Sequence, residues 1–154
     1  MSASDRTSLR LSGGKNPKRI KYESPVGIPN QAYFPQGVWQ SLGDPTSPLI
    51  LTEGEKKALA GTQAGYSCVR LVGVFGWQLA RKRNKYGHAS GPRYLIPDLA
   101  AIPWQGRLVF VIFDSDAATK PQVQAAERHL VAALTAAGAI VRIVRLPAAH
   151  DLEK

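Results

Sequence analysis

The stretch Leu108-Val109-Phe110-Val111-Ile112-Phe113, followed directly by Asp114-Ser115-Asp116, decides the fold. Six consecutive apolar residues, rich in β-branched and aromatic side chains, are typical of a strand that is buried on both faces of a sheet. Such strands belong to parallel sheets that are covered by helices. The acidic residues that end this run would then lie at the carboxyl edge of the sheet, where open parallel sheets bind their ligands.

The segments on either side alternate between strand and helix patterns. A helix is expected from Glu55 to Ala64, ending at Gly65, and a second from 121 to 137 with Thr119 as its cap. This alternation predicts an α/β fold, in which right-handed crossovers join a mostly parallel sheet of about four strands flanked by helices. Besides the strand quoted above, short apolar strands are expected at 49–52, 67–74 and 139–146.

Composition limits the class of protein. The 154 residues are 44% hydrophobic, which suits one domain with a real core, and 20 Lys/Arg against 11 Asp/Glu leave a net charge of +9. A basic balance of that size indicates a polyanionic partner. The single cysteine, Cys68, excludes a disulfide scaffold and fits a reducing compartment. With no secretory signal and no apolar run near the ~20 residues of a membrane helix, a cytoplasmic protein without a membrane partner is expected.

Three regions are expected along the chain. Residues 1–20 are basic and lack hydrophobic periodicity, which predicts a flexible arm. Residues 21–48 place Tyr33-Phe34 and Val38-Trp39 among Pro and Gly turn signals, which predicts an irregular or β extension docked on the main domain. Residues 49–154 form that main domain.

Acidic residues follow two of the expected strands. Glu53-Gly54-Glu55 follows the first strand, and Asp114 and Asp116 follow the third. If the backbone stays extended, the two aspartates point the same way and can share one hard cation such as Mg²⁺, which prefers oxygen ligands. Glu53 could complete that site or act as a general acid or base. The alternative is that these acids only cap helices, whose N-terminal dipoles favour negative charge.

These motifs resemble the Toprim domain, the catalytic module of bacterial-type primases, topoisomerases and certain nucleases and recombination proteins. The chain is more closely similar to the Toprim-like domain of unknown function in phage and plasmid primase–helicase proteins, over roughly 21–147. The shared motifs are Lys21-Tyr22-Glu23-Ser24-Pro25, Tyr33-Phe34-Pro35-x-Gly37-Val38, Thr52-Glu53-Gly54-Glu55-Lys56-Lys57-Ala58, Gly73-Val74-x-Gly76-Trp77 and Phe113-Asp114-Ser115-Asp116.

The resemblance implies a Toprim-like catalytic domain over 49–154, with Glu53 as the family's glutamate and Asp114 and Asp116 as its metal-binding aspartates. In primases these acids organise Mg²⁺, or Mn²⁺, around nucleotide phosphates, and in topoisomerases and nucleases they assist strand cleavage. Such domains often carry a further acidic pair after the last strand. This chain ends soon after that strand, which is compatible with a fragment truncated at its C-terminus.

The connection after the second strand is basic. From Lys56 to Pro97 there are eight Lys/Arg and no Asp/Glu, and aromatic residues are interleaved with them. This composition suits a segment that contacts phosphates and stacks on bases. The alternative is an ordinary solvated loop without a nucleic-acid partner. One of Lys56 and Lys57 is expected to face a phosphate. The candidate nucleic-acid-binding residues are Lys56, Lys57, Trp77, Arg81, Lys82, Arg83, Lys85 and Arg93.

Three functions follow as hypotheses. The first is a Mg²⁺-dependent Toprim domain of a phage or plasmid DNA replication protein, with primase-type nucleotidyl transfer on single-stranded DNA from nucleotides. The second is a Toprim nuclease that uses the same carboxylates. The third is a non-catalytic nucleic-acid-binding module that tethers a helicase or another replisome partner to single strands. Composition does not rank these functions, and the resemblance favours the first.

Overall fold

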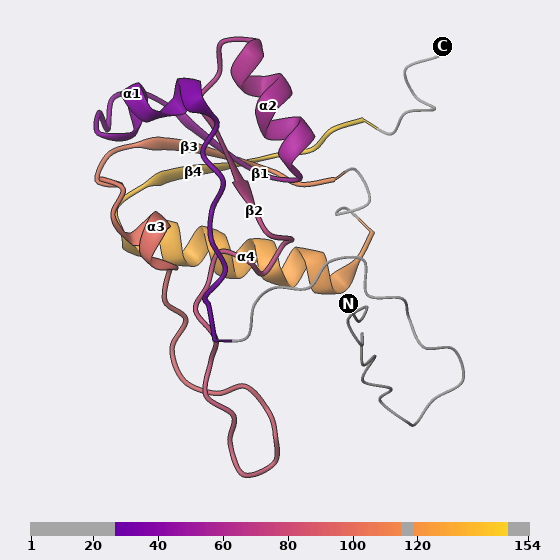
Figure 1. Ribbon diagram of the computed structural model, residues 1–154. Helices are drawn as coiled ribbons and strands as arrows, with labels where there is room; N and C mark the ends of the chain where they lie inside the picture. The colour runs from indigo at the N-terminus through magenta and orange to yellow at the C-terminus, as the bar shows by residue number, and fades with distance from the viewer. Residues whose placement is uncertain (1–26, 115–118, 148–154) are drawn as a thin grey trace, which may run out of the picture.

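Four strands form one all-parallel sheet in the order β2-β1-β3-β4 (Figure 1). The computed structural model describes residues 27–114 and 119–147. Helices flank the sheet, so the predicted α/β fold class is confirmed. The strands are β1 (Leu49–Glu53), β2 (Cys68–Leu71), β3 (Leu108–Ile112) and β4 (Ile140–Val144).

The two central strands are β1 and β3, which lie side by side. Leu51 is in register with Val69 of β2 on one side and with Val111 of β3 on the other. Alternate residues of these strands are fully buried, as the apolar runs in the sequence predict. Because the strands are parallel, β1 and β3 end at the same edge of the sheet, and the chain leaves both there.

The helices lie on opposite faces of the sheet (Figure 1). The helix α2 (Glu55–Gln63) joins β1 to β2, and α4 (Pro121–Ala136) joins β3 to β4. These two crossovers add strands at opposite ends of the sheet, so crossovers of the same hand put their helices on opposite faces. A short helix, α3 (Pro97–Ala100), lies on the α4 side.

The predicted start of α4 at 121 is confirmed, but the cap differs from the expected Thr119. Lys120 occupies the N-cap position and makes no capping hydrogen bond through its side chain, and Pro121 is the first helical residue. Thr119 therefore stands one residue too early to be the cap. Proline suits this first position because its missing N–H would have no partner within the helix.

The hydrophobic core lies between the sheet and α4. Leu130 and Leu134 of α4 are fully buried, as are Leu49, Val109 and Val111 of the sheet. Two tryptophans from the connections complete this core, with Trp77 fully buried and Trp104 nearly so. The indole N–H of Trp104 donates to the carbonyl of Leu99 at 2.8 Å.

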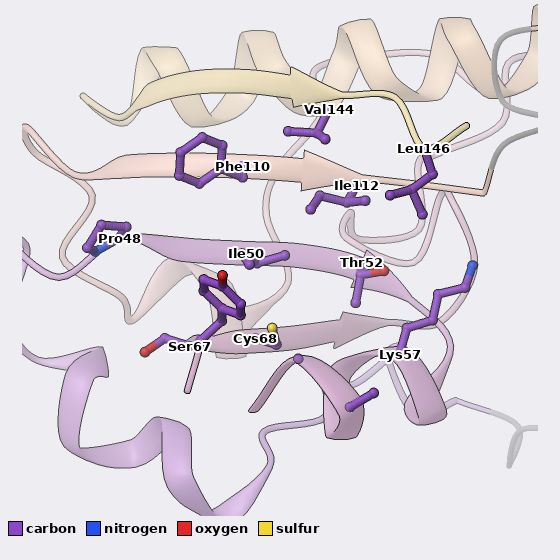
Figure 2. Close-up of a pocket in the computed structure, with 13 residues that line it drawn as sticks. Pro48, Ile50, Thr52, Lys57, Ser67, Cys68, Phe110, Ile112, Val144 and Leu146 are labelled. Atoms are coloured by element: carbon purple, nitrogen blue, oxygen red, sulfur yellow. The ribbon is translucent and has the colours of Figure 1, made fainter. Parts of the chain in front are cut away.

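On the opposite face, helices of the described part of the chain cover only part of the sheet. The helix α2 packs over β1 and β2, and beside it lies an apolar groove of about 630 Å³, lined by residues of all four strands. Phe110 and Ile112 of β3 and Val144 of β4 form its floor, and Leu146 and Lys57 stand at its carboxyl end (Figure 2). In the part of the chain that the structure describes, no helix is both long enough and apolar enough to cross a membrane.

The described part of the N-terminal extension packs onto the domain. It contains the short helices η1 (Gln36–Val38) and α1 (Trp39–Leu42), which sequence patterning did not predict. Tyr33 forms an antiparallel bridge with Arg70, and Val38 is fully buried. Residues 1–26, which include the expected basic arm and the start of the expected extension, lie outside the described residues.

Arg107, just before β3, fastens this extension to the sheet. Its side chain is fully buried, and its Nη2 donates to the carbonyls of Ser41 at 3.1 Å and Leu42 at 2.9 Å and also contacts the carbonyl of Asp44. These carbonyls lie at the C-terminal end of α1, where helical carbonyls lack partners within the helix. Burial lowers the pKa of the Arg107 guanidinium, and the nearby charge of Asp44 opposes that shift.

We expect Arg107→Met to destabilise the protein by about 1–3 kcal/mol, because it removes the donor to buried carbonyls. Urea denaturation measures this loss. The matched control is Arg142→Met on β4, since Arg142 is exposed and donates to the neighbouring carbonyl of Val141. Equal stability of the two variants would show that Arg107 does not fasten the extension.

Gly61 allows α2 to approach β2 closely. A Cβ atom at this position would overlap the Sγ atom of Cys68. We expect Gly61→Ala to cost about 1–3 kcal/mol of unfolding free energy through this overlap. In a Cys68→Ala background the overlap is gone, and the same change should stabilise by up to about 1 kcal/mol, because alanine is the better helix former. A double-mutant cycle measures both values, and an equal penalty in the two backgrounds would contradict this packing.

Candidate functional site

Glu53 and Asp114 meet at the carboxyl edge of the sheet. Glu53 is the last residue of β1, and Asp114 follows β3 after one further residue. The backbone N–H of Asp114 donates to Oε1 of Glu53 at 3.4 Å. The expectation that these two acids converge, although they are far apart in the sequence, agrees with this contact. Pairing of β1 with β3 is its structural cause.

Gly54 makes the sharp turn from β1 into α2. Its φ of 89° lies in the region that favours glycine, and α2 begins at the next residue. The turn brings the first residues of α2 to the same edge as the two acids. There the ammonium group of Lys57 forms an ion pair with the Asp114 carboxylate. The strand–glycine–helix turn therefore places a cation beside the convergent acids.

A hollow of about 730 Å³ opens at this edge, and we call it the carboxylate hollow. Charges of both signs line it, and one further ion pair joins Arg70 of β2 to Glu55 at 3.3 Å. Such a surface suits a ligand that carries phosphate groups together with a cation. The lining residues are Glu53, Gly54, Glu55, Lys56, Lys57, Arg70, Leu71, Val72, Gly73 and Asp114.

The two lysines of the first turn of α2 have different surroundings. Lys57 pairs with Asp114 and also borders the apolar groove of Figure 2. Lys56 is exposed, lines the carboxylate hollow and does not border the apolar groove. Sequence periodicity left open which of them faces the site, and the ion pair identifies Lys57 as the one in contact with an acidic side chain.

Two of the three acids expected to bind a hard divalent cation lie at this edge. Mg²⁺ is commonly bound through one or two carboxylates with several waters, and Glu53 and Asp114 both line the carboxylate hollow. The ion pair with Lys57 is an independent sign that a positive group is accepted at Asp114. Among residues 27–114 and 119–147, no group of three potential metal ligands is found. Asp116, the third expected ligand, lies outside the described residues.

The basic connection forms a hairpin rather than an open loop. Gln78 bridges Leu95, and Arg83 bridges Ala89 nearer the tip. Two of its arginines bind the hairpin's own backbone: Arg81 donates to the carbonyl of Gly91 at 2.9 Å, and Arg83 to that of Gly87 at 2.7 Å. The hairpin projects away from the sheet on the α4 side, and its tip is well separated from the end of β3 in Figure 1.

The remaining predicted contact residues differ in exposure. Lys82 and Lys85 are exposed near the hairpin tip, with the Lys85 ammonium 5.0 Å from the centre of the Tyr86 ring. Trp77 lies fully buried in the core, where its indole ring has no face open to a base. Sequence reasoning missed Phe75, two residues earlier, whose side chain is 43% exposed.

The fold and this edge define an α/β domain in which two acidic residues line one hollow at the carboxyl end of a parallel sheet. Residues 38–153 match the family described as "Domain of unknown function (DUF3854)", and the chain belongs to that family. It is also 34% identical over 112 residues to an uncharacterized protein of Picosynechococcus sp. (strain ATCC 27264 / PCC 7002 / PR-6). That match covers 71% of this chain and 11% of the relative. No solved structure matches the chain.

Proposed function

We propose that this chain is the Mg²⁺-dependent Toprim-type module of a phage or plasmid DNA replication protein, and that it carries out primase-type nucleotidyl transfer on single-stranded DNA. The observation that carries the proposal is the contact between Asp114 and Glu53 at the carboxyl edge. Three further features support the proposal: the resemblance to Toprim motifs, the net charge of +9, and the position of the acids at the edge where parallel sheets bind ligands. A cytoplasmic location is part of the proposal.

Each residue at the edge has a role in this proposal. Glu53 and Asp114 would hold the divalent ion together with Asp116, and the bound ion would neutralise charge on the nucleotide phosphates. In this proposal Glu53, whose Oε1 accepts the backbone N–H of Asp114, would also accept or donate a proton. Lys57, released from Asp114, could contact a phosphate oxygen from the first turn of α2.

Primer synthesis tests the proposal. With a single-stranded DNA template, nucleotides and Mg²⁺ or Mn²⁺, we expect Asp114→Asn and Glu53→Gln each to lower the rate about 100-fold or more, since each removes a charge from the reacting centre. The matched control is Glu55→Gln, which removes an acid of the same hollow that is paired with Arg70. Activity of the control should stay near that of the wild type.

The products of the same reactions distinguish the alternatives. Equal activity of the wild type, Asp114→Asn and Glu53→Gln would remove the catalytic assignment. Cleaved template without nucleotide incorporation would replace the primase proposal with a nuclease. Both products are resolved on one denaturing gel when template and nucleotide carry different labels.

A second candidate function is a nucleic-acid-binding module without catalysis. The ion pair between Lys57 and Asp114 favours it, because it neutralises the carboxylate without any metal ion. Such a module would tether a helicase or another replisome partner to single strands. It predicts binding to single-stranded DNA that needs no metal, falls steeply with salt and survives Asp114→Asn.

A further inference from the structure

A second hollow, of about 510 Å³, lies at the base of the hairpin between its two strands and the start of the described chain. Its lining combines Phe75, Asn30 and Gln78 with the two arginines Arg81 and Arg93. No acidic residue lines it among the described residues. Its lining shares no residue with the carboxylate hollow. We call it the arginine hollow.

The two arginines bring two positive charges to one hollow. Both are half-buried, and within the described part of the chain neither has a carboxylate partner. Arg93 donates through Nη1 to the side-chain oxygen of Gln78 at 2.8 Å, and Arg81 donates through Nε and Nη2 to the carbonyl of Gly91. These bonds fix the two guanidinium groups at the wall of the hollow and leave other N–H groups of each for a ligand.

The charge of Arg81 acts on Arg93. Burial lowers the pKa of the Arg93 guanidinium, and the positive charge of Arg81 lowers it further. Two like charges held at one hollow repel each other, and an anion between them would remove that repulsion. Arginine is suited to this because its planar group offers paired donors to phosphate oxygens.

Phe75 supplies an aromatic face at the same hollow. It lies in a tight turn, in which Gly76 packs so closely on the Val72 backbone that a Cβ would overlap it. The next residue, Trp77, is fully buried, and its carbonyl accepts the N–H of Ile96 at 2.9 Å. The contacts of Gly76 and Trp77 therefore fix the backbone next to Phe75, while Phe75 itself stays exposed. A stacking platform needs an exposed aromatic ring on a fixed backbone.

We infer that the arginine hollow binds one nucleotide unit of a single-stranded nucleic acid, with Arg81 and Arg93 on its phosphate and Phe75 stacked on its base. The inference deepens the proposed function, because it gives the template strand a binding site apart from the carboxylate hollow. A hollow of this size lies within the usual range for small-ligand sites, about 300–1,000 Å³. Binding there needs no metal ion.

The experiment is a titration of a fluorescently labelled oligo(dT) strand with the full chain, in EDTA, followed by anisotropy. We expect Phe75→Leu to weaken binding about 5- to 100-fold, which corresponds to one lost base–aromatic stack, and Phe75→Trp to retain it. Retention in Phe75→Trp separates stacking from misfolding. The matched control is Tyr86→Leu, which removes a 71% exposed aromatic ring near the hairpin tip that does not line this hollow.

The phosphate contact is tested by salt dependence. We expect Arg93→Gln to reduce the slope of log affinity against log salt by about 0.7, the value for one phosphate contact with a single strand. Arg142→Gln, an exposed arginine of β4 outside the hollow, should leave the slope unchanged. Thymidine monophosphate is the competitor that distinguishes a strand from a free nucleotide, and we expect it to bind much more weakly than the oligonucleotide.

Three results would overturn the inference: unchanged affinity in Phe75→Leu, an unchanged salt slope in Arg93→Gln, or equal affinity for the monophosphate and the strand. Because the titration contains no divalent ion, its outcome is independent of primer synthesis. Any of these three results, together with intact primer synthesis by the wild type, would refute this inference and leave the catalytic proposal standing. Intact strand binding without primer synthesis would refute the catalytic proposal alone.

Discussion

Pairing of β1 with β3 is the constraint on which the rest of the structure depends. The two strands are not consecutive along the chain, because α2, β2 and the long basic connection lie between them. Their parallel register nevertheless brings Glu53 and Asp114 to adjacent positions at one edge. A sheet in which β2 or β4 separated these strands would hold the same residues but would not bring the two acids together.

The same topology explains why Lys57 stands at that edge. In a parallel sheet each crossover helix begins where the preceding strand ends, so the first turn of α2 lies beside the acid that ends β1. A lysine there opposes the helix dipole, which is unfavourable by a few tenths of a kcal/mol, or about 1 at most. Its ion pair with Asp114 offsets that cost. The two convergent acids and the lysine thus form one electrostatic unit, which a cation or a phosphate group would rearrange.

Local sequence patterns predicted the sheet well because its strands are short apolar runs with clear boundaries. All four expected strands and both long helices are present, and their ends differ from the predicted ones by at most three residues. The helix α1 and its attachment were not predicted, because they depend on Arg107, a charged residue that only tertiary contacts bury. Charged side chains are almost never fully buried unless paired, so nothing local distinguishes such an arginine.

The structure brings two of the predicted acids together and places most of the predicted basic residues on a separate hairpin. Acids that end parallel strands share an edge, so the alternation of strands and helices predicts a common edge for Glu53 and Asp114. Their contact also requires the pairing of β1 with β3, which the linear pattern does not specify. The hairpin's arginines and Trp77 depend on three-dimensional folding of a long connection, which the linear pattern does not contain. Arg81 and Arg83 bind the hairpin backbone, and Trp77 belongs to the core. The exposure of Phe75 likewise depends on how this connection folds.

The most direct measurement is a titration of the isotope-labelled chain with Mn²⁺, followed by two-dimensional amide NMR. Paramagnetic broadening reports which backbone amides lie near the ion. If Glu53 and Asp114 hold a divalent cation, the amides of Glu53, Gly54 and Asp114 will broaden first, at substoichiometric ion, and excess Mg²⁺ will restore them. The amide of Gly106, before the amino end of β3, should stay sharp. Broadening that is uniform along the chain, or centred away from this edge, would contradict the central claim.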